Sequence, residues 1–474
     1  MPKSLMELEA EIKESFNLLN YPPKSVIPSL TDPKGKVMID ALIVGGGMNG
    51  LAAAFALRRL GVEKIRQIDT AEPGKAGPWR TYARMEFLRS GKNLTGPSLG
   101  HSLLTPRSWW QAKHPGAKWE EGGYFKREEW ADYIEWYGKI TGAIVEYRTE
   151  LKSLDAHDKF VDVSIISDGN KLSHFCARNV ILATGRDGLA SPRIPIAFEK
   201  LRDDHRVLHS SKIFDPSTMA AKRVAVIGLA ASAFDNAALV AEAGATVTII
   251  GRAMEVPRLN KMKHTVTAAF AEGFPLLPNT EKLRWLTHIT ECRIAPPHHT
   301  VKRVAGLGVK LLTGNSVKRV EIKNESLELF LDKSSVEVDQ VILATGFKMD
   351  LSSVGFLKNV FDDIKLWADA LPEKDKEDRN NEWMEFPFLG NGFEFLAKQK
   401  NRISAIQRIF CFNHASQLSL GNLANDIPHA SFGAERLGRA IVSSLFIEDK
   451  YYHYQTLLDY SDPELAGDEW PGQL

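Results

Sequence analysis

The chain has 474 residues, of which 44% are hydrophobic and 25% are charged, and its formal net charge is +1. This composition is typical of folded globular proteins and excludes a largely disordered chain, and the length allows two or three domains. The near-neutral charge gives no broad basic surface, so we expect neither nucleic acid nor a membrane as a partner.

The N-terminal segment, residues 1–35, predicts an amphipathic helix followed by a linker. Leu5, Leu8, Ile12 and Phe16 recur at helical spacing, while glutamates between them rule out the apolar core of a signal peptide. No apolar run reaches the length of a membrane span. The helix either docks on the body of the protein or serves as a partner-binding arm.

The chain has three cysteines, Cys176, Cys292 and Cys411, which lie far apart in the sequence. None belongs to a C-x-x-C pair, so the sequence offers neither a disulfide framework nor a local redox dithiol. A reducing, cytoplasmic setting fits this pattern best.

A dinucleotide-binding fingerprint is present near the N-terminus. The apolar segment 37–44 predicts a strand, which breaks at the turn Gly45-Gly46-Gly47-Met48-Asn49-Gly50. An Ala/Leu-rich helix is predicted at 51–60 and a strand at 64–68, and Asp69 closes that strand. Strand, glycine turn, helix, strand and acid in this order are what the fingerprint requires.

Each residue type in this turn has a physical reason. Gly45 permits the tight turn, Gly47 lets backbone N–H groups approach a pyrophosphate, and Gly50 lets helix and strand pack closely. The helix N-terminus faces the phosphate charge, and Asp69 can accept hydrogen bonds from ribose hydroxyls. The alternative is a glycine turn that only packs a helix.

A second unit of the same kind begins with a strand at 224–227. It continues with the turn Gly228-Leu229-Ala230-Ala231-Ser232-Ala233, a helix at 236–243 and a strand at 246–250. Arg252 stands where the first unit has an acid, and a guanidinium can bind a 2′-phosphate bidentately, which favours NADPH over NADH. Ala230 replaces the middle glycine and crowds the pyrophosphate, so a non-binding repeat is the alternative.

Two near copies of one segment follow these units, at 180–185 and 341–346. Each is an apolar strand ending in Ala-Thr-Gly, namely Ala183-Thr184-Gly185 and Ala344-Thr345-Gly346. A small, turn-capable ending lets a chain pass close to a bound cofactor and cross between domains.

From about 37 to 446 the sequence resembles flavoproteins with two dinucleotide-binding domains and, among them, the class B flavin-dependent monooxygenases. The resemblance rests on both glycine turns, on Arg252 and on Ala344-Thr345-Gly346-Phe347. Gly77-Pro78-Trp79 is similar to the family's Gly-Gly-x-Trp element beside the flavin, and Met85-Glu86-Phe87-Leu88-Arg89 to a stretch of N-hydroxylating members.

Within this family the chain is similar to a short bacterial subgroup with urate hydroxylase-like and pyrrolizidine-forming Baeyer–Villiger members. That likeness rests on the segments 79–85 and 257–261. The family's F-x-G-x-x-x-H motif retains only His209, followed by Ser210, because Asp203 and His205 stand where Phe and Gly belong. The choice between ketone oxidation and heteroatom or ring oxidation therefore stays open.

The resemblance implies an α/β fold with two Rossmann-like dinucleotide-binding domains. An NADPH-binding domain, 216–333, is inserted between the two parts of an FAD-binding domain, 36–215 and 334–474. Asp426 precedes a helix predicted to about residue 444, and it either caps that helix or binds the ribityl chain. The expected cofactor contacts are Gly45, Gly47, Met48, Asn49, Gly50, Asp69, Trp79, Thr184, Gly185, His209, Ser210, Gly228, Ala230, Ser232, Ala233, Arg252, Thr345, Gly346 and Asp426.

The activity implied is monooxygenation of a small organic substrate with NADPH and O2, through a C4a-(hydro)peroxyflavin. Arg89, Lys92 and Arg258 could stabilise a peroxy anion, and Asn93 could hydrogen-bond the oxygen adduct, although an ordinary salt bridge is the alternative for each cation. An NADPH-dependent flavin reductase serving a quinone or partner protein is a second hypothesis. A non-catalytic FAD-binding protein is a third. We expect no metal site.

Overall fold

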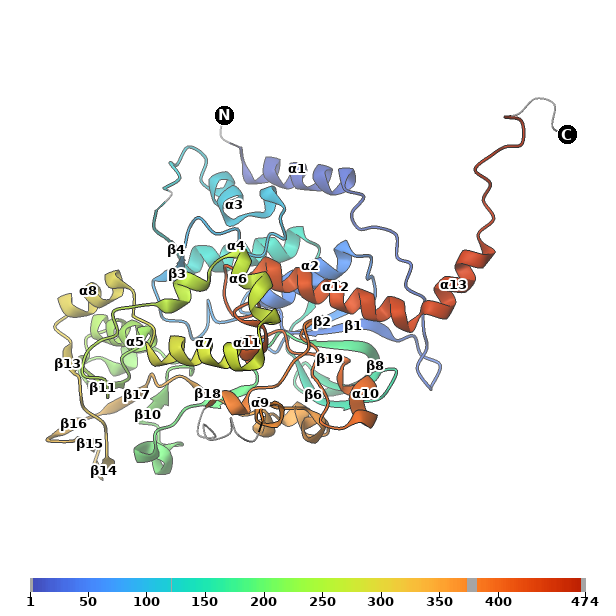
Figure 1. Cartoon of the computed structure of the whole chain (residues 1–474). Coiled ribbons are helices and arrows are strands. Elements are labelled where there is room, and N and C mark those ends of the chain that lie inside the picture. Colours follow the sequence, from blue (N-terminus) through green and yellow to red (C-terminus); the bar gives the residue numbers. More distant parts are fainter. Residues whose placement is uncertain (1–2, 121, 373–381, 470–474) are drawn as a thin grey trace.

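The computed structural model describes residues 3–120, 122–372 and 382–469 and contains two large sheets (Figure 1). The first sheet has the order β5-β2-β1-β8-β7-β6, and β19 also pairs with β8. The pairs formed by β1, β2, β5 and β19 are parallel, whereas β6, β7 and β8 form an antiparallel meander. Its strands are β1 (Ile39–Val44), β2 (Ile65–Ile68), β5 (Val145–Glu146), β6 (Thr149–Ala156), β7 (Val161–Ser167), β8 (Lys171–Leu182) and β19 (Ile409–Phe410).

The second sheet is parallel throughout, with the order β10-β17-β11-β12-β13. Its strands are β10 (Val207–His209), β11 (Arg223–Ile227), β12 (Thr246–Ile250), β13 (Lys310–Leu312) and β17 (Gln340–Leu343). Because β10 and β17 belong to it, this sheet extends beyond the predicted interval 216–333 at both ends. Both are short apolar strands, and their sequences do not reveal which of the two sheets they join.

Helices rich in small residues pack closely on the two large sheets and on each other. The alanine-rich helix α2 (Met48–Arg59) is buried over residues 50–57, and α12 (Ala430–Glu448) packs along it. The packing is close, since a Cβ on Gly438 would lie 3.2 Å from the Cβ of Ala56. The second sheet carries α5 (Ala231–Glu242) and α8 (His298–Gly306), which contact each other.

The N-terminal helix α1 (Leu5–Leu18) is docked on the body. Leu8 and Ile12 are buried, and the Phe16 ring lies 5.8 Å from the ring of Phe55 on α2. Trp136 on α4 (Arg127–Ile140) donates a hydrogen bond to Glu9. The docked alternative for this helix is therefore confirmed.

Smaller elements complete the described chain. The pairs β3–β4 and β9–β18 are two-stranded, and β14, β15 and β16 form an antiparallel sheet beside the second large sheet. Among the described residues, no helix has both the length and the apolar composition of a membrane span. The bounds of these elements are β3 (Phe87–Gly91), β4 (Tyr124–Lys126), β9 (Ala190–Pro192), β14 (Arg319–Lys323), β15 (Ser326–Phe330), β16 (Ser335–Val338), β18 (Phe347–Met349), α3 (Pro106–Lys113), α6 (Ala268–Gly273), α7 (Asn279–Glu291), α9 (Trp367–Ala370), α10 (Ile403–Ile406), α11 (Gln417–Leu420) and α13 (Lys450–Asp459).

Candidate functional site

The first glycine turn joins β1 to α2 and is packed too tightly for side chains at two of its glycines. Gly45 has φ +123°, and a Cβ there would lie 2.3 Å from the Ala183 carbonyl oxygen. A Cβ on Gly50 would lie 2.0 Å from the Gly45 carbonyl oxygen. Gly47, the N-cap of α2, leaves the helix N-terminus uncovered and would place a Cβ 3.7 Å from Gly77. These are the roles that the fingerprint predicts.

Asp69 lies at the end of β2 beside this turn. One carboxylate oxygen accepts the Gly46 N–H at 2.6 Å, and the other accepts the Ala71 N–H at 2.7 Å. A cavity of about 260 Å³ borders Gly46, and Trp79 and Tyr147 lie in its wall. Burial, together with the nearby Asp69 carboxylate, raises the pKa of Tyr147. Open glycines, a helix N-terminus, an acid and a cavity at one place fit the adenosine and pyrophosphate of FAD.

The second turn repeats this backbone between β11 and α5. Gly228 has φ +140°, and a Cβ there would lie 2.5 Å from the Ala344 carbonyl oxygen. Ala230 is the N-cap of α5 and is exposed, so its methyl stands where a pyrophosphate would approach. Ser232 is in the first turn of α5, its carbonyl accepting the Asn236 side chain at 2.8 Å, and Ala233 is fully buried.

Arg252 lies two residues after β12, one position beyond Gly251, which occupies the place that Asp69 has directly after β2. Its side chain is exposed, and it has no hydrogen bond or ion pair with any residue that the structure describes. An unengaged guanidinium at this edge fits the 2′-phosphate of NADPH.

The two Ala-Thr-Gly segments are structurally equivalent crossings. Gly185 and Gly346 each have φ +78°, in the left-handed region. The Thr184 hydroxyl accepts a hydrogen bond from Asn413 at 3.1 Å, and the Thr345 hydroxyl donates to the Arg193 carbonyl. Each crossing therefore turns sharply just after its strand.

His209 is held within this second crossing. One ring nitrogen lies 2.9 Å from the Gly346 carbonyl oxygen, and the other lies 2.7 Å from the Ser211 hydroxyl. Burial lowers the pKa of His209. The Ser210 N–H donates to the Leu343 carbonyl at 3.0 Å. Because both ring nitrogens have partners in the chain, His209 fastens β10 to the crossing.

A polar cluster that no sequence motif predicts lies directly beyond the first crossing. The Tyr82 hydroxyl donates to Asp187 at 3.2 Å, and Asn425 lies 3.2 Å from the ring of His414. Burial and the charge of Arg186 lower the pKa of His414 to about 3, so this ring is neutral. The signal in the sequence was Arg186 itself, a cation placed immediately after Ala-Thr-Gly.

Arg186 has an unusual environment. Its side chain is exposed, yet the surrounding protein and Arg89 lower its pKa. Arg186 therefore lies near Arg89, whose guanidinium donates a hydrogen bond to Asp235 on α5.

Among the four predicted catalytic residues, Arg89 and Lys92 have partners. Arg89 on β3 donates a hydrogen bond of 3.1 Å to Asp235 on α5, so it connects the two units. Burial raises the pKa of Asp235, and Arg89 opposes this shift. The Lys92 ammonium lies 5.1, 5.4 and 5.8 Å from the ring centres of Trp110, Trp119 and Phe125.

Asn93 and Arg258 are exposed and have no side-chain hydrogen bond or ion pair with any described residue. Among the described residues, no side-chain hydrogen bond or ion pair joins the four predicted catalytic residues to one another, and their catalytic role stays a prediction.

The loop before α12 connects this helix to the first turn. Asn49 donates to the Ala424 carbonyl, while Met48 is half-buried in the same turn. Asp426 accepts the His429 backbone N–H at 3.1 Å and lies 3.1 Å from the His429 ring. Asp426 therefore stabilises the turn before α12, whose N-cap is His429 without a side-chain cap hydrogen bond, and its second carboxylate oxygen lies 3.4 Å from the His429 ring.

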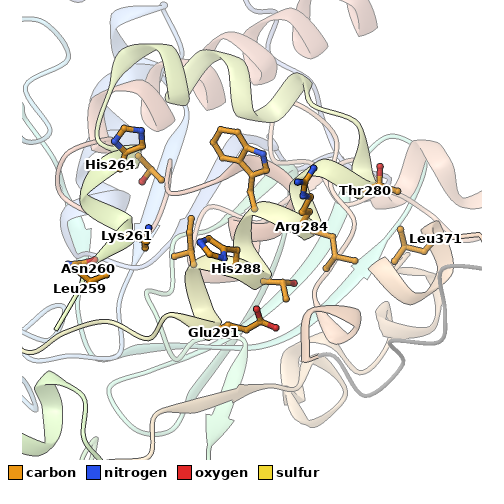
Figure 2. Close-up of a pocket in the computed structure, with 14 residues that line it drawn as sticks. Leu259, Asn260, Lys261, His264, Thr280, Arg284, His288, Glu291 and Leu371 are labelled. Carbon is orange, nitrogen blue, oxygen red and sulfur yellow. The ribbon is translucent and has the colours of Figure 1, made fainter. Parts of the chain in front are cut away.

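A groove of about 1450 Å³ runs along α7 (Figure 2). Arg284, His288 and Glu291 project from α7 into it, and Lys261 and His264 line its other end. The buried Thr265, also in its wall, accepts a hydrogen bond of 3.2 Å from Asn422 in the loop before α12. The groove is thereby connected to the segment that carries Asp426.

In the described ranges, no group of three or more histidine, cysteine or acidic side chains could hold a metal ion. The three cysteines are free, and Cys176 and Cys411 are buried. Burial raises the pKa of Cys176 to about 12, so its thiol stays protonated.

Fold and site together define a flavoprotein with two dinucleotide-binding domains. The predicted α/β class is confirmed, and solved structures share the architecture. The ornithine hydroxylase PvdA from Pseudomonas aeruginosa aligns with a TM-score of 0.66 at 17% identity, covering 86% of this chain and all of that one. The FAD-bound cadaverine monooxygenase DfoA from Erwinia amylovora gives 0.64 at 15% identity, covering 92% and 99%.

Sequence comparison defines the family. Residues 42–382 match the family described as pyridine nucleotide-disulphide oxidoreductase. The chain is 30% identical over 472 residues to the FAD-dependent urate hydroxylase of Xanthomonas campestris pv. campestris, covering 99% of this chain and 98% of that protein. The chain therefore belongs to the pyridine nucleotide-disulphide oxidoreductase family, and its resemblance to class B flavin-dependent monooxygenases is confirmed.

Proposed function

We propose that this protein is an FAD- and NADPH-dependent monooxygenase that inserts one oxygen atom of O2 into a small organic substrate. The observation that carries the proposal is the pair of equivalent glycine turns, at Gly45 and Gly228, each packed against the carbonyl of an Ala-Thr-Gly segment. Two such turns in one chain would bind a flavin dinucleotide and a nicotinamide dinucleotide. The full-length likeness to a urate hydroxylase supports oxygen insertion.

The chain's own residues would bind and orient the two cofactors. The N-termini of α2 and α5 would offset the pyrophosphate charges, and Asp69 and Arg252 would select the two adenosine halves. Bound FAD supplies hydride acceptance from NADPH and activation of O2, which side chains alone cannot provide. Arg186 would contribute a positive charge that does not titrate near neutral pH, and the neutral His414 would contribute a hydrogen-bonding group.

For the substrate, we propose a small, polar nitrogen heterocycle of the urate kind. The support is the relative at 30% identity and the groove along α7. Lys261, Arg284 and two histidines line this groove and suit an anionic or hydrogen-bonding molecule. The segment 257–261, which carries the subgroup likeness, supplies part of the lining.

A flavin reductase is the second candidate function. The absence of paired cysteines weighs against a disulfide acceptor, because every cysteine is free and none lies in a C-x-x-C pair. A quinone or a protein as electron acceptor remains compatible with both glycine turns. A protein that binds FAD without catalysis would need a second glycine turn that cannot bind NADPH. Ala230 is the residue whose methyl could prevent that binding.

Product analysis with ¹⁸O2 separates these functions. The FAD-loaded protein is incubated with NADPH, ¹⁸O2 and urate or related heterocycles, with catalase present to remove hydrogen peroxide. We expect substrate-stimulated NADPH oxidation and one ¹⁸O atom in the product. NADPH oxidation that yields only hydrogen peroxide with every substrate, or that needs an added quinone, would contradict the proposal. Absence of flavin reduction by NADPH would favour the binding-only protein.

A further inference from the structure

Trp285 on α7 is an exposed tryptophan in the wall of the groove. It is 44% exposed, whereas every other tryptophan that the structure describes is buried or half-buried. A protein of this kind has many places to bury an indole, and Trp109, Trp130 and Trp367 show this. An aromatic surface left open inside a concave site is a surface on which a ligand can pack.

The indole rests on two further aromatic rings that are fixed in the body of the protein. The ring centres of Trp285 and Phe270 on α6 lie 6.2 Å apart, with the planes inclined by 35°. Phe270 stacks in turn on Phe274 at 4.8 Å, and Phe274 is buried. Because these rings support the indole, it loses little side-chain freedom when a ligand covers its exposed part.

The same two rings pack on the loop before α12. A Cβ on Gly421 would lie 2.9 Å from Phe270 and 3.1 Å from Phe274, so the loop passes directly against them. Further along this loop, Ala424 accepts the hydrogen bond from Asn49 in the first glycine turn. The wall of the groove at Trp285 is therefore joined by direct packing to the loop that contacts the predicted FAD site.

Three polar side chains form a row on α7 beside the indole. Arg284, His288 and Glu291 are spaced four and three residues apart, so they share one face of the helix and project into the groove (Figure 2). Trp285 borders this row, because it lies three residues before His288. Arg284 also forms an ion pair of 3.5 Å with Glu281, but both side chains are exposed, so this pair contributes little.

The row offers a donor at one end and an acceptor at the other. The Arg284 guanidinium donates, the Glu291 carboxylate accepts, and the ring of His288 between them has a nitrogen of each kind when it is neutral. Arg284 and Glu291 are about 10 Å apart along the helix axis. A flat apolar surface beside such a row suits a planar fused-ring heterocycle whose edge carries both carbonyl oxygens and N–H groups. Urate has such edges and is an anion at neutral pH, which a guanidinium favours.

We propose that Trp285 is a specificity-determining residue of the substrate site and stacks on the plane of a fused-ring heterocycle. Arg284 binds a carbonyl oxygen at the edge of the ring, and Glu291 accepts an N–H from it. The choice of heterocycle rests on the proposed function, and the role of Trp285 in recognising the ring plane goes beyond it.

Binding of urate to the oxidised, FAD-loaded full chain tests this role without NADPH or turnover. Isothermal titration calorimetry should show at least about 10-fold weaker binding to Trp285→Leu, because the stacking contact is lost. Trp285→Phe keeps an aromatic plane and should bind within about 3-fold of the wild type. The control is Leu276→Ala, which shortens an apolar side chain that is 71% exposed and does not line the groove, and it should bind like the wild type.

A second pair of variants tests the edge of the ring. Arg284→Met should weaken urate binding about 5-fold, because a charge-assisted hydrogen bond is lost. Arg293→Met removes the same charge from an exposed residue just after α7 that does not line the groove, and it should leave the affinity unchanged. FAD content and Tm should be equal in all five variants, because every substituted residue is exposed.

Turnover separates this inference from the proposed function. With urate as substrate, Trp285→Leu should raise KM about 10-fold and change kcat less than about 2-fold. A wild type that does not bind urate, or a Trp285→Leu variant with wild-type affinity, would overturn the role of Trp285. Incorporation of ¹⁸O with an unchanged KM in Trp285→Leu would overturn that role and leave the monooxygenase function intact. Urate binding that depends on Trp285 but gives no ¹⁸O product would support the subsite and contradict the proposed function.

Discussion

The two glycine turns share a backbone and differ where a side chain would meet a ligand. The Gly45 N–H donates to Ile68 at 2.8 Å and the Gly228 N–H to Ile250 at 2.9 Å, and both glycines pack against the carbonyl of an Ala-Thr-Gly segment. The two turns share these backbone contacts because the close approach of strand, turn and helix requires them. The differences, Gly47 against Ala230 and Asp69 against Gly251 followed by Arg252, lie at the ligand-facing positions and would give each unit its own dinucleotide.

The largest effect is expected from Gly50→Ala in the first unit. The new methyl would lie 2.0 Å from a backbone oxygen, so α2 must shift away from β1. We expect loss of nearly all bound FAD and a drop of more than about 3 kcal/mol in the free energy of unfolding. Gly47→Ala is the matched control for the free energy of unfolding, because its Cβ would have ordinary contacts at 3.7 Å and φ is already negative. Equal FAD content in Gly50→Ala and wild type would refute the tight packing.

Arg89→Met breaks the connection between the two units. Asp235 is 3% exposed and would lose its ion-pair partner, while Arg89 is 38% exposed, so we expect a loss of about 2 kcal/mol. Differential scanning calorimetry measures it, with Asn93→Ala as a nearby exposed control.

This loss should depend on pH. Burial raises the pKa of Asp235 above its ordinary 3.8, so its ionisation costs stability as the pH rises through the raised pKa. Removing Arg89 raises that pKa further. The Tm difference between variant and wild type should therefore be largest at neutral pH and shrink toward pH 3.8. A difference that does not change with pH would exclude Asp235 as the cause.

Arg252→Ala should change cofactor choice without changing the fold. Arg252 is exposed and has no ion pair with the described chain, so the Tm should stay within error of the wild type. The KM for NADPH should rise about 20-fold while the KM for NADH stays nearly constant, because a charge-assisted hydrogen bond to the 2′-phosphate is lost. Arg258→Ala, six residues further along the chain, is the control. An unchanged preference for NADPH would exclude a 2′-phosphate at Arg252.

Ala230→Gly gives the smallest expected effect. It makes the second turn resemble the first and removes the methyl that crowds the pyrophosphate, which NADP⁺ and NADPH share, so NADP⁺ should bind about 3-fold more tightly. Stability should not fall, because glycine is at least as good an N-cap as alanine. Binding is measured by titration of the oxidised protein with NADP⁺. Weaker binding would mean that the Ala230 methyl contacts the cofactor favourably.

The sequence predicted the fold well where local pattern decides it. The strand at 246–250 coincides with β12, and the apolar strands at 180–182 and 341–343 lie in β8 and β17. Helices α2 and α5 begin at Met48 and Ala231, earlier than the predicted starts at 51 and 236, because each helix starts inside its glycine turn.

The site was less predictable, since its contacts join residues far apart in sequence. Nothing near Arg89 indicates that it pairs with Asp235, and nothing near Lys92 indicates three aromatic rings around its ammonium. Arg186 and His414 lie on opposite sides of the inserted unit, and only the fold brings them together. The glycine turns can be predicted from the local sequence, whereas the contacts between side chains depend on how the fold brings distant segments together.

Anaerobic titration of the FAD-loaded protein with NADPH tests the central claim most directly, namely that the two units hold FAD and NADPH next to each other. The visible absorbance of the bound flavin is followed, with NADH as the comparison. We predict full bleaching by one equivalent of NADPH and slower reduction by NADH, with the difference abolished in Arg252→Ala. Flavin that stays oxidised under excess NADPH would contradict the account.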